Sequence, residues 1–352
     1  MKQGVLIYGC YGYTGELISR YAAERGLQPT LAGRDKQKVE KLAAELKLPS
    51  LVFDLTNDAT VERSINPFKV VLHCAGPFQY TATPMINACI KTGTHYLDIT
   101  GEYTVFESAF KRNEEAQKAG VLLMPGVGFD VVPSDCLSLY LKEQLPDAVQ
   151  LELALAQKGG RISHGTAITV TENLGHSCMV RRNGSLVPVK NGSLLRTITI
   201  EGKPRVAVAI PWGDIATAYR STGIPNITVY NSVPKKVIDG MKLSNYIGFV
   251  FRWRWVKNYL IKKIKQRPAG PNETERKNAA SFIWGEVKNA SGKTYSAVLQ
   301  LPEGYTITYL TAVRIAELVM QGNAPTGAKT PAQAFGCNFI LQFEGVKRTD
   351  SV

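Results

Sequence analysis

The stretch Val5-Leu-Ile-Tyr-Gly-Cys-Tyr-Gly-Tyr-Thr-Gly15 decides the fold of this chain. Its first four residues form an apolar run with the composition of a buried strand, and glycine then recurs at every third position. Apolar residues at helical spacing follow, and a second apolar run, residues 30–32, ends at Gly33-Arg34. The order strand, glycine-rich turn, helix, strand is typical of the opening of a dinucleotide-binding fold.

Each glycine of this turn has a physical role in such a fold. Gly9 allows a sharp turn because it has no Cβ, Gly12 lets the backbone approach a diphosphate, and Gly15 lets the helix pack closely on the strand. The N–H groups at the start of the helix then face the anion. The turn residues expected to contact a cofactor are Gly9, Tyr11, Gly12, Tyr13, Thr14 and Gly15. The alternative is a glycine-rich turn in an α/β domain that binds no nucleotide.

The end of the second strand selects the cofactor. An NAD site usually has Asp or Glu there to bind the ribose 2′-hydroxyl, whereas this chain has Arg34. A guanidinium can hold a 2′-phosphate through two parallel hydrogen bonds and can stack on adenine, so the sequence predicts NADP. Asp35 is the competing residue, since it could bind the hydroxyl instead. Lys36 and Lys38 are expected on a solvated helix face.

Strands and helices continue to alternate as far as residue 124. Four more strands are predicted from further apolar runs, at residues 51–53, 70–74, 95–99 and 121–124. Helices are expected between them, at residues 34–46, 83–92 and 106–119. This alternation predicts an α/β fold with a Rossmann-type doubly wound parallel sheet. Asp54, just after the third strand, is a candidate contact for the adenine amine.

Three loops that follow successive strands carry polar residues and glycines: Cys74–Phe78, Asp98–Glu102 and Pro125–Asp135. Because the carboxyl ends of parallel strands meet at one edge of a sheet, we expect these loops to converge around the nicotinamide half of the cofactor. The loop residues expected to contact it are Ala75, Gly76, Pro77, Gly126 and Gly128. The sequence therefore predicts the active site at this edge.

The pattern changes near Pro146. Residues 151–156 alternate as a half-buried strand, a helix is expected from His164 to Gly175, and strand-like segments recur up to residue 231. Residues 282–287 and 295–301 have the pattern of a hairpin. From these patterns we expect a dinucleotide-binding domain of residues 1–146, joined by a returning segment 306–352, and a second, mixed α/β domain of residues 147–305 that binds the substrate.

The six cysteines are scattered and form no C-x-x-C pair. Several lie in apolar runs, which favours reduced, buried thiols over disulfides or a zinc site. The chain begins directly with a strand pattern and has no apolar run long enough to cross a bilayer. We therefore expect a cytoplasmic protein. No cluster of His, Asp and Glu has the spacing of metal ligands, so no catalytic metal is expected.

The net charge of +13 is concentrated in one stretch. Between Lys235 and Arg267 there are ten lysine and arginine residues against one acid, Asp239, which gives that stretch a net charge of +9. The basicity is local, so we expect no nucleic-acid partner. Within this basic amphipathic stretch, residues 242–267, the apolar residues of segment 246–265 follow helical spacing. Such a helix can lie on an anionic membrane surface, or it can pack on the second domain or across a dimer.

Several motifs together resemble one family, the saccharopine dehydrogenase-like oxidoreductases. They are Gly9-x-x-Gly-Tyr-Thr-Gly15, Ala32-Gly33-Arg34, Cys74-Ala-Gly-Pro-Phe78, Tyr96-x-Asp-x-x-Gly-Glu102 and Pro125-Gly-x-Gly-Phe-Asp-x-x-Pro-Ser-Asp135. In the second half, the motifs similar to the branch with trans-acting enoyl reductases of lipid biosynthesis are Ile210-Pro-Trp-Gly-Asp214, Trp284-Gly-Glu286 and Thr330-Pro-Ala-x-Ala-Phe-Gly336. The resemblance implies an NADP-binding Rossmann domain and a second α/β domain that supports catalysis and often subunit pairing. It does not imply saccharopine as the substrate.

Hydride transfer needs a proton donor or acceptor near the reacting atom. Asp130 is one catalytic candidate, because it follows two glycines in the loop after the last strand; its alternative role is to cap the helix that starts near Val132. Asp98 is the other catalytic candidate, and it could instead orient the nicotinamide ribose or bind backbone amides. Backbone amides are the expected partners of Glu102. Further candidates are Tyr103, Ser134, Asp135, His164, Glu172, His176, Trp212, Asp214 and Tyr219.

Two functions fit these observations. The first is an NADP-dependent oxidoreductase that transfers hydride to a carbonyl, imine or enoyl group on a small-molecule or lipid-linked substrate, which we expect to act as a homodimer. The second is a non-catalytic scaffold or sensor that binds NADPH and associates with lipid surfaces. The glycine turn and Arg34 fit both functions. The three polar loops around the nicotinamide site favour the enzyme.

Overall fold

The chain divides into two compact units in this computed structural model, which describes residues 2–351. Unit 1 comprises the chain up to Val132 and Tyr305–Phe335; unit 2 comprises Pro133–Gly304 and the chain from Gly336 onward. The expected boundaries therefore need a correction, because residues 133–146 and 336–352 belong to unit 2. The last strand pairs with a strand of unit 2, so only part of the expected returning segment joins the first unit.

Within the described residues, the sheet of unit 1 has seven strands: β1 (Val5–Tyr8), β2 (Thr30–Gly33), β3 (Ser50–Val52), β4 (Val70–His73), β5 (His95–Asp98), β6 (Leu122–Met124) and β15 (Gly327–Ala328). All neighbours pair in parallel, in the order β15-β6-β5-β4-β1-β2-β3. The predicted doubly wound parallel sheet is confirmed, with β15 as an additional strand. The strand order reverses between β1 and β4, which is where ligands bind in open α/β sheets.

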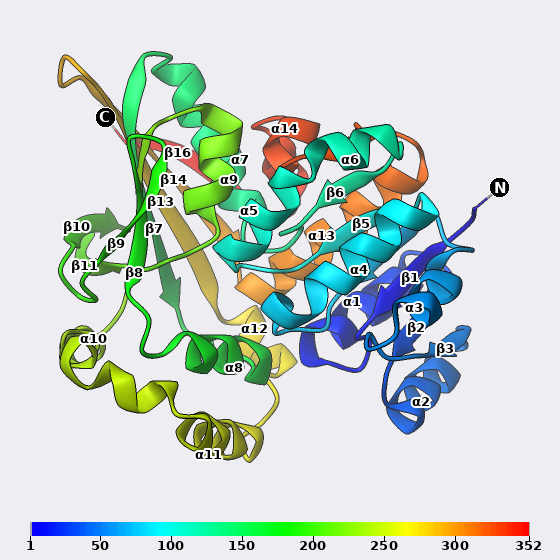
Figure 1. Ribbon diagram of the computed structural model, residues 1–352. Helices are drawn as coiled ribbons and strands as arrows, with labels where there is room; N and C mark the ends of the chain where they lie inside the picture. The colour runs from blue at the N-terminus through cyan, green and yellow to red at the C-terminus, as the bar shows by residue number, and fades with distance from the viewer. Residues whose placement is uncertain (1, 352) are drawn as a thin grey trace. The chain divides into compact units, whose positions relative to one another are not determined.

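Helices cover both faces of this sheet (Figure 1). One face carries α1 (Tyr13–Glu24), α2 (Lys36–Leu46) and α13 (Gly304–Met320), and the other carries α3 (Asp58–Ile65), α4 (Phe78–Thr92), α5 (Tyr103–Lys111) and α6 (Asn113–Lys118). Right-handed crossovers cause this division, since the chain moves in opposite directions along the sheet before and after β3. α3 has no counterpart among the predicted elements, and α5 and α6 replace the single helix expected at 106–119. The short helix α14 (Pro331–Phe335) ends the unit.

The sheet of unit 2 is mixed. Its strands are β7 (Ala148–Lys158), β8 (Cys178–Arg182), β9 (Ser185–Val189), β10 (Leu195–Ile200), β11 (Lys203–Ala209), β12 (Asn226–Ser232), β13 (Ala280–Asn289), β14 (Thr294–Pro302) and β16 (Lys347–Ser351). β12 and β7 pair in parallel, whereas the other pairs, including the predicted β13–β14 hairpin, are antiparallel. The mixed second domain is confirmed, and β8 and β16 are strands that the sequence patterns did not indicate.

The helices of unit 2 include α7 (Val132–Gln144), α8 (His164–Asn173), α9 (Asp214–Thr222), α10 (Lys235–Ile247), α11 (Arg254–Lys265) and α12 (Glu273–Lys277), with 3-10 turns η1 (Gly248–Arg252) and η2 (Phe339–Gln342). α7 packs on the sheet where Gly285 leaves room for Leu137 and Leu141. The stretch expected as one helix at 246–265 is divided by η1. Among residues 2–351, no helix has the length and apolar character needed to cross a membrane.

Candidate functional site

The turn between β1 and α1 depends on two glycines. Gly9 has a φ of +84°, and a Cβ on it would lie 2.8 Å from the Ala75 Cβ in the loop after β4. A Cβ on Gly15 would collide with the carbonyl oxygen of Gly9. Glycine at these positions therefore lets the β1–α1 turn close on itself and touch the β4–α4 loop. Both loops lie at the carboxyl ends of adjacent strands.

The N-terminus of α1 is suited to an anion. Gly12 is the N-cap residue and supplies no side-chain hydrogen bond to the helix. A Cβ on Gly12 would have only the Gly9 carbonyl oxygen within 4 Å, at 3.4 Å, so the space around it is open. An uncapped helix N-terminus presents N–H groups and a partial positive charge to a phosphate. Contacts of Gly12, Tyr13 and Thr14 with a diphosphate stay predictions.

The end of β2 brings together the residues predicted to select the cofactor. The ring of Tyr11 packs against Gly33, where a Cβ would lie 2.5 Å from the ring. Burial is the main cause of the raised pKa of the Tyr8 hydroxyl. The nearby Tyr11 and Asp54 raise this pKa further, and Arg34 lowers it. The three side chains therefore lie near the Tyr8 hydroxyl, at this edge of the sheet.

Asp35 and Asp54 are occupied by local hydrogen bonds. Asp35 caps α2, accepting a 3.2 Å hydrogen bond from the Lys38 backbone N–H and pairing with its Nζ at 3.1 Å. Asp54 accepts hydrogen bonds of 2.9 and 2.5 Å from the backbone and hydroxyl of Thr56. Capping explains why Asp35 follows Arg34, and it argues against Asp35 as the ribose ligand. The adenine contact of Asp54 stays a prediction, which could use its second carboxylate oxygen.

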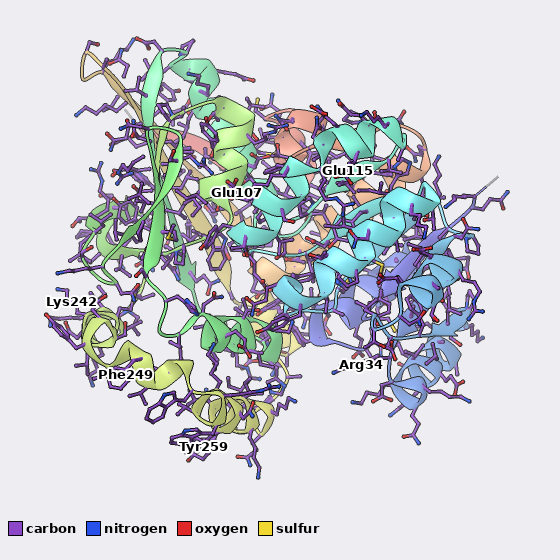
Figure 2. The ribbon with its side chains drawn as sticks, in the orientation of Figure 1. Arg34, Glu107, Glu115, Lys242, Phe249 and Tyr259 are labelled. Carbon is purple, nitrogen blue, oxygen red and sulfur yellow. The ribbon has the colours of Figure 1, made fainter. Side chains whose placement is uncertain are left out.

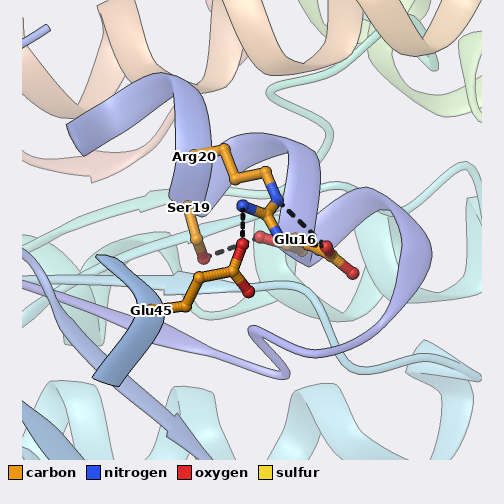
Figure 3. A network of polar contacts seen from close by, with 5 residues as sticks. Glu16, Ser19, Arg20 and Glu45 are labelled. Carbon is orange, nitrogen blue, oxygen red and sulfur yellow. Dashed lines mark hydrogen bonds and ion pairs between the residues drawn. The ribbon is translucent and has the colours of Figure 1, made fainter. Parts of the chain in front are cut away.

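Two arginines of unit 1 differ in whether their guanidinium group has a partner. Arg20 is held on both sides, by Glu16 at 2.7 Å within α1 and by Glu45 at 2.7 Å from α2 (Figure 3). Arg34 is exposed beside α2 (Figure 2) and has no hydrogen-bond or ion-pair partner among residues 2–351. Its guanidinium is therefore available to a phosphate, whereas that of Arg20 is used to join α1 to α2.

The loop after β4 is built to present backbone at the surface. Gly76 is exposed, with Ala75 and Pro77 partly exposed beside it. The start of α4 is capped from a different loop: both oxygens of Glu102 accept backbone N–H groups, from Phe78 at 2.9 Å and Gln79 at 2.8 Å. The expectation that Glu102 binds backbone amides is confirmed. Thr81, in α4, donates a 2.6 Å hydrogen bond to the Ala75 carbonyl and so fixes the loop to the helix.

Asp98 is a structural brace. Its side chain is 0% exposed, and its carboxylate accepts hydrogen bonds from the Tyr96 hydroxyl at 2.6 Å, the Thr100 N–H at 2.9 Å and the Gly126 N–H at 2.8 Å. These bonds join the loop after β5 to the loop after β6. The catalytic role predicted for Asp98 is not supported, because no part of the side chain can reach a ligand. Backbone amides, the second interpretation, are among its partners.

Gly126 and Gly128 are explained by packing within unit 1. Gly126 has a φ of +76°, and a Cβ on it would lie 2.6 Å from the Phe106 ring. A Cβ on Gly128 would lie 2.8 Å from Thr308 of α13. Both glycines are buried, so their predicted contact with a cofactor lacks support. Their absent side chains instead let the β6–α7 loop lie between α5 and α13.

Asp130 differs from Asp98 in its exposure and its hydrogen bonding, although the pKa of both carboxyl groups is raised. It is partly exposed, and its carboxylate has no hydrogen-bond partner in the described part of the chain. It faces the backbone of Gly101, where a Cβ would lie 3.1 Å from a carboxylate oxygen. Its carboxylate does not accept a bond from the first turn of α7, so the capping interpretation is not supported. Crowded, poorly solvated surroundings raise its pKa to about 7.

Residues of α13 hold the β6–α7 loop in place. The Thr308 hydroxyl accepts a 3.0 Å hydrogen bond from the Phe129 N–H, and Thr311 donates a 2.7 Å hydrogen bond to the Val127 carbonyl. No local pattern in the sequence pointed to these two threonines, which lie more than 170 positions away from the loop.

The remaining candidates lie in unit 2 or at helix starts. Tyr103 begins α5 and Ser134 and Asp135 lie in the first turn of α7. His164 bonds the Arg267 carbonyl at 2.8 Å, Glu172 pairs with Lys257 at 3.3 Å, and the Tyr219 ring faces Arg181. Asp214 is the first residue of α9, after the N-cap residue Gly213, and it is buried. The His176 carbonyl accepts a 3.0 Å hydrogen bond from the Asn191 side-chain amide. The indole N–H of Trp212 is buried and has no hydrogen-bond partner among residues 2–351.

Comparisons with known proteins agree with this geometry. Residues 5–124 match the family model of the saccharopine dehydrogenase NADP binding domain. The chain is 28% identical over 223 residues to a saccharopine dehydrogenase-like oxidoreductase from Mus musculus, which covers 56% of this chain and 51% of the mouse protein. It is 31% identical over 144 residues to a trans-acting enoyl reductase from Mycobacterium leprae (strain TN), covering 39% of this chain and 34% of that protein. The chain thus spans about half the length of the curated relatives it matches, or less.

The fold of both units is similar to that of a solved enzyme. Apo saccharopine dehydrogenase (L-Glu forming) from Saccharomyces cerevisiae matches with a TM-score of 0.67 at 12% identity, covering 99% of this chain and 100% of that chain. At this identity the likeness concerns the fold. The uncapped helix, the free Arg34 and the open Gly12 fit an NADP molecule, in agreement with the match of residues 5–124 to the saccharopine dehydrogenase NADP binding domain.

Proposed function

We propose that this protein is an NADP-dependent oxidoreductase that transfers hydride to a carbonyl, imine or enoyl group. One observation carries the proposal: at the edge of the sheet where the cofactor-binding residues gather, Asp130 is a partly exposed carboxyl group without a hydrogen-bond partner among residues 2–351. Its pKa of about 7 makes it able to give and accept a proton at neutral pH. A protein that only binds NADPH has no need for such a group.

In this proposal each side chain at the edge has a separate task. The N-terminus of α1 and Arg34 bind the diphosphate and the 2′-phosphate. NADPH, when bound, supplies the hydride. Asp130 in its protonated form donates the proton that completes the reduction. Asp98 and Glu102 orient the loops that surround it, through their hydrogen bonds to backbone N–H groups.

The substrate is a finer proposal. The names of the mycobacterial relatives favour an enoyl acceptor over a carbonyl, and we propose that the acceptor is lipid-linked. The saccharopine reaction has weaker support, because the likeness to the yeast enzyme concerns the fold. Assays with acyl thioesters that carry a trans-2 double bond, compared with keto and imino acceptors, separate these substrate classes.

The first experiment measures cofactor choice. Arg34→Ala should weaken NADPH binding about 10–100-fold, since hydrogen bonds to charged groups contribute about 1.5–3 kcal/mol, and should leave NADH binding unchanged. Arg63→Ala, which removes an exposed cation from α3, is the matched control. Equal losses for NADPH and NADH, or tighter binding of NADH by the unaltered protein, would contradict the assignment of Arg34. NADPH binding without oxidation by any acceptor class would favour the non-catalytic alternative.

A further inference from the structure

Unit 2 exposes a large aromatic surface on one short segment. We call residues 235–265, which comprise α10, η1 and α11, the basic aromatic segment. Tyr246 is 80% exposed, Trp255 66% and Phe249 60%, and the other exposed apolar side chains are Val237, Leu243, Ile247, Trp253 and Tyr259. In Figure 2, Lys242, Phe249 and Tyr259 lie along the outer edge of this segment. Contiguous exposed apolar surface of this kind marks an interaction site.

These side chains are exposed although the segment is anchored. Val256, Leu260 and Ile264 form the partly buried side of α11, which packs against α8. Lys257 donates a 2.5 Å hydrogen bond to the Glu172 carbonyl and so fixes α11 on α8. The apolar residues expected on one stripe are therefore divided: the aliphatic ones pack inward and the aromatic ones face outward. The packing of α11 on α8 therefore does not account for the exposed tryptophans.

The aromatic rings form a continuous cluster. The ring centres of Phe249 and Trp253 are 6.4 Å apart, and those of Trp253 and Trp255 are 6.0 Å apart. On the same helix, Tyr259 lies 4.8 Å from the Nζ of Lys263. Tryptophan and tyrosine prefer the boundary between water and hydrocarbon, because each ring has an apolar body and a polar edge.

Positive charge surrounds this cluster. The exposed cations of the segment are Lys235, Lys236, Lys242, Arg254, Lys262, Lys263 and Lys265. Asp239 is the only acid in the segment, and it pairs with Lys235 at 2.8 Å. Six exposed cations therefore have no carboxylate partner among the residues the structure describes. Each basic residue near an anionic membrane adds to binding, and the effect decreases with salt.

We propose that the basic aromatic segment is a membrane-docking surface that binds anionic lipid bilayers. Phe249, Trp253 and Trp255 enter the interface between headgroups and acyl chains, and the lysines contact the headgroups. This inference stands apart from the proposed hydride transfer, because it uses residues of unit 2 that have no part in the nucleotide site.

Charge argues against a second copy of the chain as the occupant of this surface. A two-fold dimer interface places the same surface against itself, so it would bring the lysines of one copy against those of the other. Repulsion between like charges grows as water is excluded from between them. An anionic bilayer offers the opposite charge together with an apolar layer, which satisfies both features of the segment.

The test is flotation of the full-length protein with phosphatidylcholine vesicles that contain 0 or about 30% phosphatidylserine. We expect binding to the anionic vesicles at low salt and a large loss at 0.5 M salt. Trp253→Ser/Trp255→Ser should weaken binding at least about a hundredfold, and Lys262→Ala/Lys263→Ala about thirtyfold. The four tryptophans allow a second readout: emission should shift to the blue on binding and be quenched by brominated acyl chains, and Trp253→Phe/Trp255→Phe should bind but lose both signals.

Lys288→Ala/Lys293→Ala is the matched control, since it removes two exposed cations from the β13–β14 hairpin of the same unit. It should leave flotation unchanged, and all variants should keep the melting temperature of the unaltered protein. Three results would overturn the proposal. They are no flotation with anionic vesicles at low salt, equal losses in the two double-lysine variants, and a stable dimer in ultracentrifugation that Trp253→Ser/Trp255→Ser converts to a monomer.

Discussion

The end of β5 and the loop after β6 each carry an aspartate with a pKa raised to about 7 by burial. Asp98, the last residue of β5, is fully buried and accepts three hydrogen bonds, two of them from backbone N–H groups. Asp130, in the loop after β6, is partly exposed and faces the Gly101 backbone. The Gly126 N–H donates a hydrogen bond to Asp98. Asp98 thereby anchors the loop that carries Asp130.

The difference shows that a raised pKa does not by itself identify a catalytic group. Desolvation acts on both carboxyl groups, but only one of them can meet a ligand. Hydrogen bonds lower the pKa of Asp98 against the effect of burial, whereas burial is the only cause at Asp130. Exposure and the absence of bound donors therefore decide which of two similar aspartates is placed to transfer a proton.

The largest effect is expected from Asp130→Asn. An amide cannot donate the proton that we assign to this residue, and general acid catalysis contributes about 10²–10⁴-fold, so kcat should fall by that factor. NADPH affinity should stay close to that of the unaltered protein, and the melting temperature at pH 7 should not fall, because the variant removes a carboxyl group that is costly to ionise in the fold. Single-turnover oxidation of NADPH measures the change. A variant with full activity would remove Asp130 from the mechanism and make the two loops equivalent.

Asp98→Ala should act on folding instead of chemistry. It leaves the N–H groups of Thr100 and Gly126 and the hydroxyl of Tyr96 buried without their acceptor, and each unsatisfied group costs about 1–3 kcal/mol. We expect the free energy of unfolding, measured by urea titration, to fall by about 3–5 kcal/mol. Tyr96→Phe, which removes one of the three bonds, is the graded control and should cost about 1–2 kcal/mol. A stable Asp98→Ala protein that lacks activity would restore Asp98 as a catalytic candidate.

The pH dependence separates the two aspartates. With Asp130 as the proton donor, kcat/KM for reduction should be constant below about pH 7 and fall tenfold per pH unit above it, because the donor is lost. A carboxyl group with a folded pKa near 7 and an unfolded pKa near 3.9 stabilises the fold less as pH rises between these values. Asp130→Asn should therefore remove the break in the rate profile and reduce the slope of stability against pH. A break that persists in this variant would point to another donor.

The smallest effect is expected from Glu102→Gln. Glu102 accepts the N–H groups of Phe78 and Gln79 with its two oxygens, and an amide retains one acceptor. The loss should be about 1 kcal/mol of unfolding free energy, the typical contribution of a helix cap, without a change in cofactor choice. Thermal unfolding with and without NADPH measures it. A large loss of NADPH affinity would show that Glu102 contacts the cofactor directly.

Much of this site could be predicted because its parts are local. Gly9 and Gly15 are needed for a turn whose conformation involves residues close in sequence, and Arg34 lies at a fixed place after β2, so the pattern alone indicates them. Backbone amides were predicted as the partners of Glu102, and its carboxylate accepts two of them. The hydrogen bond from Gly126 to Asp98 was not predicted, because its two residues are distant in sequence, and the support from Thr308 comes from a distant helix.

The sequence by itself determined the parallel sheet, the glycine turn and the preference for NADP, since period, glycine spacing and the residue after β2 are properties of short segments. Tertiary structure alone decided which aspartate is open, because exposure depends on what the rest of the chain covers. It also decided that Lys347–Ser351 complete the second sheet and that the tryptophans of the basic aromatic segment face outward. Helical spacing in the sequence predicts which residues of α11 lie on one side of the helix. Only the packing of α11 against α8 shows which side is buried.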